Sequence, residues 1–276
     1  MTARLYVYCV GDELSGASFE GLAGVGGARV SLLGLGRLAA AVSAAADEPV
    51  AVTEENLAAH NRVNAAALAG STPLPFRFGT LAARERLADY AASNEASLLA
   101  ALARVRGCVE MGVKLMEEAR GAGRGARGAS EGAASAGGVQ GVVAAPPEGF
   151  DEAASLGAAR DSLERGSLPR GEGARVGRGT AFLLRKRREV MGEEDARRRA
   201  EGLAAWLAAG VGELARESAV RVSPSEAIAV RAAHLVERER VEEYRGRLRA
   251  LRGGRAGLRL LASGPWPPYS FSELRA

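Results

Sequence analysis

The chain has 276 residues, which is enough for one large domain or two small ones, and 47% of them are apolar while 25% are charged. This balance excludes wholesale disorder, which requires low hydrophobicity and high net charge. No stretch of about 20 residues is both apolar and free of charge, and no signal peptide is recognisable, so we expect a cytoplasmic protein without a membrane span.

The formal net charge is +4, and 33 acidic residues are interleaved with 37 basic ones. A nucleic-acid-binding protein is expected to concentrate its positive charge on one face. Five acidic residues, from Glu189 to Glu201, fall among the two arginine clusters, 185–188 and 197–199. This pattern is typical of an exposed helix with ion pairs between successive turns. The sequence therefore predicts no nucleic-acid partner, and a nucleic-acid-binding role rests only on these clusters.

The first 50 residues predict a strand followed by a hairpin. Leu5–Val10 alternates and is rich in tyrosine and valine, as a half-buried strand requires. A short helical turn is expected at Phe19–Leu22. Two apolar runs, Ala28–Leu33 and Arg37–Ser43, flank a glycine-containing turn and predict the two strands of a hairpin.

A helix is predicted next, from the cap Thr53 to about Ala69, with Asn56 at the position of a capping-box partner. It is followed by a stiff segment, Pro73–Gly79, which predicts an edge strand because proline cannot donate to a sheet ladder. Residues 1–80 are thus expected to form a small α+β domain.

The second half predicts strand, helix, strand, strand, helix and strand, the βαββαβ order of a ferredoxin-like fold. A long helix broken near Ser93 precedes it, and a low-complexity insertion at about 119–175 interrupts it. We expect an α+β fold with two domains, 1–80 and 81–263, and an extended tail at 264–276. The predicted elements after the insertion are a helix from Gly179, strands Ala219–Val222 and Glu226–Val236, a helix Glu237–Leu251 and a strand Leu258–Ala262.

Few residues stand in a pattern that suggests a catalytic or ligand-binding site. Asn56, His60 and Asn64 stand four apart and share one helix face, with Arg77 as a possible charged neighbour. Two interpretations remain: a proton-transfer or small-molecule site that uses His60 and Arg77, or a polar network that fixes the helix to the segment Pro73–Gly79.

The remaining candidates for chemistry are residues that we expect in the core. The two cysteines, Cys9 and Cys108, stand in apolar runs and are expected to be buried thiols. His234 lies among apolar residues and is expected to pack in the core or at a sheet edge. The cysteines and histidines lack metal-ligand spacing, and no phosphate or dinucleotide loop is present, so no metal, cofactor or catalytic residue is predicted.

The C-terminal stretch Gly264–Phe271, with sequence GPWPPYSF, resembles the terminal signature of the gas vesicle protein L/F family. Other blocks resemble family blocks in the same order, and they cover nearly the whole chain except the insertion. These blocks are Tyr6–Tyr8, Asn56 with His60, Leu74–Thr80 including Phe76 and Arg77, Val109–Lys114, Gly179–Lys186 and Ala232–Val236.

The resemblance implies a non-enzymatic accessory protein of gas vesicles, the gas-filled, protein-walled organelles that give buoyancy. It implies an N-terminal α+β domain and a modified ferredoxin-like domain. It also implies binding to the main shell protein and to other gas vesicle proteins, as an assembly factor or as a minor wall component. The oligomeric state is not indicated.

The tail carries three large aromatic residues, Trp266, Tyr269 and Phe271, among prolines that hold it extended. We expect it to fold back on the protein, with Trp266 buried in a groove at the domain junction. The alternative is a free tail that itself binds the shell protein. Candidate structural or partner-binding residues are Asn56, His60, Phe76, Arg77, Trp266, Tyr269 and Phe271.

Overall fold

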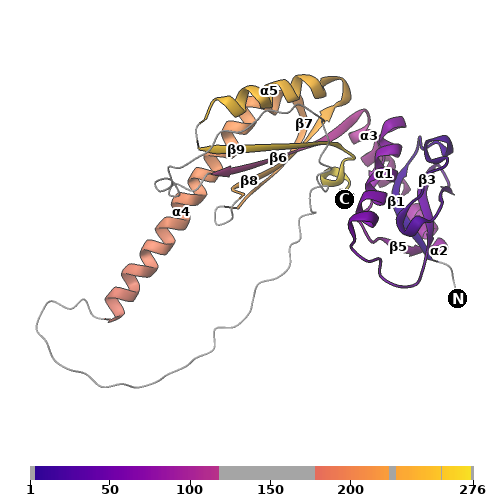
Figure 1. Cartoon of the computed structure of the whole chain (residues 1–276), viewed down its shortest axis with the longest axis horizontal. Coiled ribbons are helices and arrows are strands. Elements are labelled where there is room, and N and C mark those ends of the chain that lie inside the picture. The colour runs from indigo at the N-terminus through magenta and orange to yellow at the C-terminus, as the bar shows by residue number, and fades with distance from the viewer. Residues whose placement is uncertain (1–3, 118–177, 224–227, 256, 275–276) are drawn as a thin grey trace, which may run out of the picture.

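The computed structural model describes residues 4–117, 178–223, 228–255 and 257–274, and of residues 178–191 only the backbone (Figure 1). The insertion predicted at about 119–175 lies outside the described residues. The described elements form two antiparallel sheets, one from each half of the chain, with helices against their faces.

The N-terminal sheet has the strand order β2-β3-β1-β4, and β5 also pairs with β1. The predicted hairpin and the first strand are confirmed. The edge strand is shorter than predicted, since only two residues of the Pro73–Gly79 segment pair with β1, and a short strand after it was missed. The strands are β1 (Arg4–Gly11), β2 (Val30–Leu35), β3 (Leu38–Ala45), β4 (Leu74–Pro75) and β5 (Leu81–Ala83).

The N-terminal helices follow the signals in the sequence. The Thr53 side chain accepts a hydrogen bond from the Asn56 N–H, so the predicted cap of α1 (Glu54–Gly70) is confirmed. The predicted break near Ser93 is also present, between α2 (Arg84–Ser93) and α3 (Glu95–Val105). Two 3₁₀ turns, η1 (Gly16–Phe19) and η2 (Val25–Gly27), lie between β1 and β2, and the first replaces the predicted turn at Phe19–Leu22.

The C-terminal sheet has the strand order β7-β8-β6-β9, with all neighbours antiparallel. The predicted succession of strands and helices is present, although β7 begins earlier and β9 ends later than predicted. The elements are β6 (Cys108–Glu117), α4 (Arg178–Val211), η3 (Gly212–Leu214), β7 (Ala215–Val222), β8 (Val230–Glu237), η4 (Arg238–Arg240), α5 (Val241–Gly253), β9 (Leu258–Trp266) and η5 (Tyr269–Phe271).

Both long helices of this half, α4 and α5, pack on the same face of the C-terminal sheet. Their contacts are periodic: Leu203 and Leu207 from α4 and Tyr244 and Leu248 from α5 are at most 3% exposed. The amino-terminal half of α4 projects away from the sheet (Figure 1).

The opposite face of the C-terminal sheet meets the N-terminal half. One hydrophobic core contains residues of β1, β3, α2 and α3 together with Cys108, Leu235 and Phe271 from the C-terminal half. A separate core lies between the other face of the N-terminal sheet and α1. Strand β5 pairs with β1, so the N-terminal sheet extends beyond the domain boundary expected at residue 80.

Candidate functional site: a buried polar cluster at the junction of the two sheets

His60 lies on the face of α1 that covers the N-terminal sheet, and it is 1% exposed. Its Nδ1 is 2.9 Å from the Tyr6 hydroxyl on β1, and its Nε2 is 3.0 Å from the Tyr269 hydroxyl in the tail. Each ring nitrogen faces a hydroxyl group that can donate or accept, so a neutral imidazole is satisfied on both sides. His60 therefore joins three segments that are far apart in the sequence.

Neighbouring groups extend this network. The Tyr6 hydroxyl also accepts from the Gly79 N–H at 3.0 Å, and the Phe78 ring stands edge-on to His60. The Asn64 side-chain amide donates to the Tyr269 hydroxyl at 3.1 Å, while the Asn64 Oδ1 has no hydrogen-bond partner among the described residues. The polar-network interpretation is thus the one that the structure supports, because Tyr6 connects α1 to the segment after Pro73.

Asn56 belongs to a different contact, although it shares the helix face. Its Oδ1 accepts from the Gly26 N–H at 3.2 Å, and its Nδ2 donates to the Ala51 carbonyl at 3.0 Å. The capping-box role suggested by its position is therefore wrong. The side chain is used instead to hold the loop that contains Gly26, which has a φ of 63°.

Glu110 on β6 completes the junction and was not predicted as a site residue. Its carboxyl group is fully buried, and it accepts hydrogen bonds from the Ser270 N–H at 2.7 Å and from the Ser270 hydroxyl at 2.9 Å. Burial raises the pKa of Glu110 to about 7, and the two bonds from Ser270 oppose this rise. The carboxyl group thus fixes the residue that follows Tyr269.

The tail folds back on the protein, but its anchor differs from the expected one. Trp266 ends β9 opposite Glu110 and is only half-buried, with an indole N–H that has no partner among the described residues. Phe271 is the buried aromatic residue, at 4% exposure in the core shared by the two sheets. Trp266 is the last residue of the edge strand β9. The buried contact at the junction that was expected of its indole is therefore made by the turn Tyr269–Phe271.

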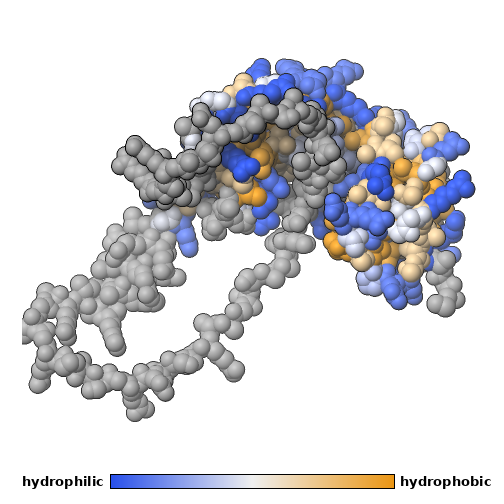
Figure 2. Space-filling model, in the orientation of Figure 1, coloured by the Kyte–Doolittle hydropathy of each residue, from blue (hydrophilic) through white to orange (hydrophobic). Residues whose placement is uncertain are grey.

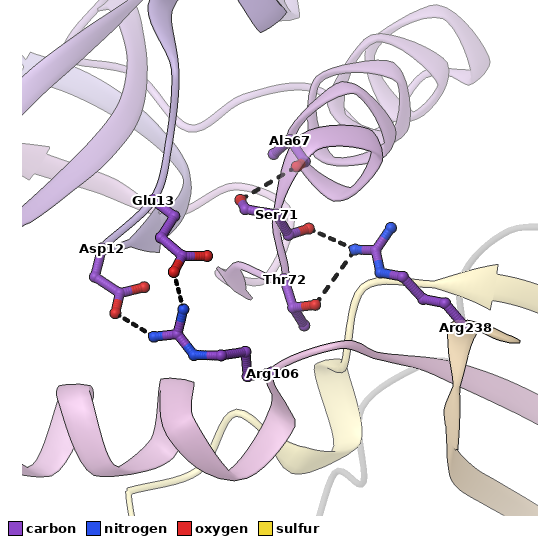
Figure 3. Close-up of polar contacts among 7 residues, drawn as sticks. All are labelled: Asp12, Glu13, Ala67, Ser71, Thr72, Arg106 and Arg238. Atoms are coloured by element: carbon purple, nitrogen blue, oxygen red, sulfur yellow. Dashed lines mark hydrogen bonds and ion pairs between the residues drawn. The ribbon is translucent and has the colours of Figure 1, made fainter.

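Two arginines add polar contacts across the junction (Figure 3). Arg106, just after α3, pairs with Asp12 and Glu13, which follow β1. Arg238, just after β8, donates to the Ser71 carbonyl at 2.6 Å and to the Thr72 hydroxyl at 3.3 Å, at the end of α1. Exposed pairs such as those of Arg106 contribute about 1 kcal/mol or less, so the apolar core and the buried bonds dominate the junction.

Phe76 and Arg77 lie away from this cluster. Phe76 lines two adjacent surface hollows of about 330 Å³ and 290 Å³, both of which also include Tyr90. Arg77 is exposed, whereas His60 is buried and its two ring nitrogens face the hydroxyls of Tyr6 and Tyr269.

Burial keeps the histidine and the tyrosines of the junction uncharged near neutral pH. Burial lowers the pKa of His60 to about 4, so the imidazole is neutral near neutral pH, and burial raises the pKa of the Tyr6 and Tyr269 hydroxyls. Within the described ranges, no group of three acidic, histidine or cysteine side chains is placed to hold a metal ion, and no helix is long and apolar enough to cross a membrane.

The other residues considered for chemistry are buried as predicted. Cys9 and Cys108 are free thiols without solvent exposure, and burial raises the pKa of Cys9 to about 12. His234 is 2% exposed, and its Nδ1 lies 2.5 Å from the Tyr244 hydroxyl of α5. In the second arginine cluster, Arg197 pairs with Glu201 four residues later, as the charge pattern predicted.

Acidification should destabilise the chain through its two histidines. Both pKa values are lowered to about 4 from an ordinary value of 6.5, so between these pH values the unfolded state binds more protons than the folded state. Glu110 acts in the opposite direction. Its pKa is raised to about 7, so the folded state keeps a proton that the unfolded state has released, and this contribution to stability is lost as the pH rises from about 4.5 to 7.

We therefore expect Glu110→Gln to steepen the loss of stability on acidification. Denaturant unfolding of the variant, followed from about pH 7.5 to 5, should show a decrease larger than that of the parent by on the order of 2 kcal/mol, because the opposing proton uptake is gone. Glu242→Gln, which removes an exposed carboxylate on α5, is the control and should follow the parent. If the stability of the parent and of Glu110→Gln depends on pH in the same way, the pKa of Glu110 is not raised in the folded state.

Comparison with known proteins places this architecture among gas vesicle proteins. The crystal structure of gas vesicle protein GvpF from Anabaena sp. PCC7120 matches with a TM-score of 0.69 and 15% identity, over 99% of this chain and 98% of that one. GvpF from Microcystis aeruginosa matches with a TM-score of 0.65 and 17% identity, over 99% and 100% of the two chains. These similarities show that this chain has the same fold as the two GvpF structures. A search of curated proteins finds no match.

The family model of the gas vesicle synthesis proteins GvpL/GvpF matches residues 4–273, so the chain belongs to this family. The resemblance seen in the sequence is thereby confirmed. The members of this family are gas vesicle proteins and not enzymes, and this chain is one of them.

Proposed function

We propose that this chain binds the main shell protein of gas vesicles, together with other gas vesicle proteins, and supports assembly of the shell. The observation that carries the proposal is the family match over residues 4–273, joined to a fold that agrees with two GvpF structures over 99% of the chain. The buried junction cluster supports a fixed scaffold for such a role, because its polar groups hold the two halves together.

The proposal includes the organisation of the chain. The small α+β unit expected at about 1–80 includes β5 as well, because β5 pairs with β1. The ferredoxin-like unit follows it up to residue 263, with the insertion at about 119–175 in its sequence, and the tail contacts both units. The sheet order β7-β8-β6-β9 with both helices on one face supports the ferredoxin-like assignment. The junction core supports a fixed arrangement of the two units. We place the protein in the cytoplasm, in association with gas vesicles.

The test is reconstitution with purified components. Tagged full-length chain should retain the main shell protein, or an accessory gas vesicle protein from the same gene cluster, and deletion of its gene should reduce the number of vesicles seen by electron microscopy. If the chain retains none of these proteins and vesicles form normally without it, the proposed function is wrong.

A further inference from the structure

Strand β2 is the outermost strand of the N-terminal sheet, and among the described residues it pairs only with β3. The turn Gly36–Arg37 joins the two strands, with Leu35 opposite Leu38. In such a hairpin the pair that closes the turn is hydrogen-bonded, and bonded and non-bonded pairs then alternate along the strands. The N–H and C=O groups of Leu32 and Gly34 therefore point away from β3, to the outside of the sheet.

A hydrogen bond at the beginning of β2 supports this assignment. Val30 stands two residues before Leu32, and its N–H donates outward to the Leu22 carbonyl at 3.4 Å. Beyond this bond, the outward N–H and C=O groups of Leu32 and Gly34 have no backbone partner among the described residues. We call the outer side of Leu32–Gly34 the open edge of β2. It offers donors and acceptors in the spacing of a sheet ladder.

The open edge lacks the features that prevent an edge strand from pairing with another chain. Proteins commonly place a lysine, a proline or a bulge in such a strand. The sequence of β2 is VSLLGL, which contains neither a charge nor a proline, and its register with β3 is regular. Ser31 on one face and Gly34 on the other are exposed, so the edge is accessible from both faces.

The end strands of the C-terminal sheet are less suited to such pairing. The sequence of β7 is ARESAVRV, which contains three charged residues, and β9 contains Pro265. Figure 2 shows hydrophilic residues over the outer surface of α5, whereas apolar residues reach the surface of the N-terminal half. An association through uncharged groups is therefore expected at β2.

We propose that β2 pairs antiparallel with β2 of a second copy of this chain, with Leu32 of each copy opposite Gly34 of the other. In this register each Leu32 and the facing Gly34 exchange N–H···O=C bonds in both directions, so every free group of both open edges is used. A shift by two residues would instead pair Val30, whose N–H is bonded to Leu22, or Gly36, which belongs to the turn.

The side chains are complementary in this register. Leu32 packs against the core beneath α1, and Gly34 lies on the same face of the sheet. Apart from the two chain neighbours of Gly34, no described heavy atom stands within 4 Å of the position that a Cβ would take there. The Leu32 side chain of the second copy fills this space. The reciprocal contact forms at the same time, because the same surface is used by both copies.

The size and charge of the open edge predict a weak association that salt does not oppose. Stable interfaces bury about 800 Å² per partner, and one pair of short strands buries less, so we expect a Kd of about 10–100 µM. Arg29 and Arg37 lie beyond the two ends of β2, are exposed, and stand opposite each other in the pair. Salt screens their repulsion, so an increase from about 50 mM to 500 mM should tighten the association.

The test is analytical ultracentrifugation of the full-length chain, from about 1 µM to 500 µM, a range that spans the expected Kd. Gly34→Lys fills the open space and adds a charge to the edge, and Gly34 has no positive φ that would strain a side chain. We expect this variant to remain monomeric, with a melting temperature equal to or above that of the parent, because glycine weakens a strand. Val220→Lys adds the same charge at an exposed residue of β7 and should associate like the parent.

A mixture of two variants tests whether the two open edges face each other. Gly34→Lys and Gly34→Glu should each be monomeric alone, since each repels its own copies. In the proposed register, residue 34 of one copy is the diagonal neighbour of residue 34 of the other, about 7–8 Å away. The two variants mixed in equal amounts should therefore associate at least about tenfold more tightly than either alone.

Four results would overturn the inference. The first is a parent that stays monomeric over the whole concentration range, and the second is a Gly34→Lys variant that associates like the parent. The third is equal loss in Val220→Lys, which would make added charge responsible. The fourth is a mixture no tighter than the single variants. If the parent is monomeric and Gly34→Lys loses binding to the main shell protein, an extended segment of that protein occupies the edge and the second copy is wrong.

The inference does not rest on the proposed function. Binding of the main shell protein to the parent is measured in the same preparations, and its presence or absence decides the proposed function alone.

Discussion

Replacing Phe271 with alanine should lower the free energy of unfolding by about 3–5 kcal/mol, the usual range for a buried phenylalanine. The ring is 4% exposed in the core shared by the two sheets, so its removal leaves a cavity between α3 and the C-terminal sheet. The hydrogen bonds between Glu110 and Ser270 would also lose their support from the neighbouring residue. Chemical denaturation at neutral pH measures the loss.

Val52→Ala is the control for Phe271→Ala, because Val52 is 77% exposed and its truncation should change stability by no more than about 0.5 kcal/mol. Limited proteolysis adds a second readout, since the freed tail should be cleaved faster in Phe271→Ala. A variant as stable and as resistant as the parent would show that the tail does not fasten the junction in solution.

His60→Ala should cost about 3 kcal/mol, since it removes the partner of two buried hydroxyl groups at once. Tyr6 and Tyr269 each lose a hydrogen bond at this position, and an unsatisfied buried polar group costs roughly 1–3 kcal/mol. The effect should be present at pH 7.5, where the imidazole is neutral because burial lowers its pKa to about 4. Denaturant unfolding at that pH measures it.

Arg62→Ala, on the exposed side of the same helix, should be nearly neutral and serves as the control. Measuring partner binding of His60→Ala alongside its stability distinguishes a structural role of His60 from a role in a binding surface. A structural residue loses stability and binding together, and binding recovers at low temperature where the variant is folded. If His60→Ala keeps the stability of the parent but loses its partner, the residue forms part of a binding surface and the junction role is wrong.

The local features of the fold were predictable because they depend on neighbouring residues. The cap at Thr53, the break near Ser93 and the hairpin around Gly36 follow from side-chain hydrogen bonds and backbone conformation within a few residues. The boundaries of β7 and β9 were less accurate. Both strands lie at sheet edges, where one side is open and the apolar pattern that marks a buried strand is weaker.

The junction could be predicted only in part. His60 and Tyr269 were recognised as candidates, but nothing local to either indicates that they touch, since 209 positions separate them. Glu110 was missed as a site residue, although a carboxylate in the middle of an apolar strand is itself a signal of a buried partner. Trp266 was chosen over Phe271 because of its size, whereas the position at which β9 ends decides which ring reaches the core.

The tail also has a consequence for synthesis on the ribosome. Phe271 and Tyr269 complete contacts with residues of β1, α1 and α3, which leave the ribosome more than 160 positions earlier. At about 5–20 residues per second, the N-terminal half waits on the order of ten seconds or more with this surface uncovered. Its packing is finished only after Tyr269 and Phe271 have left the ribosome. Nascent chains of this protein therefore present an incomplete core to chaperones, and a stop codon before Tyr269 would make that exposure permanent.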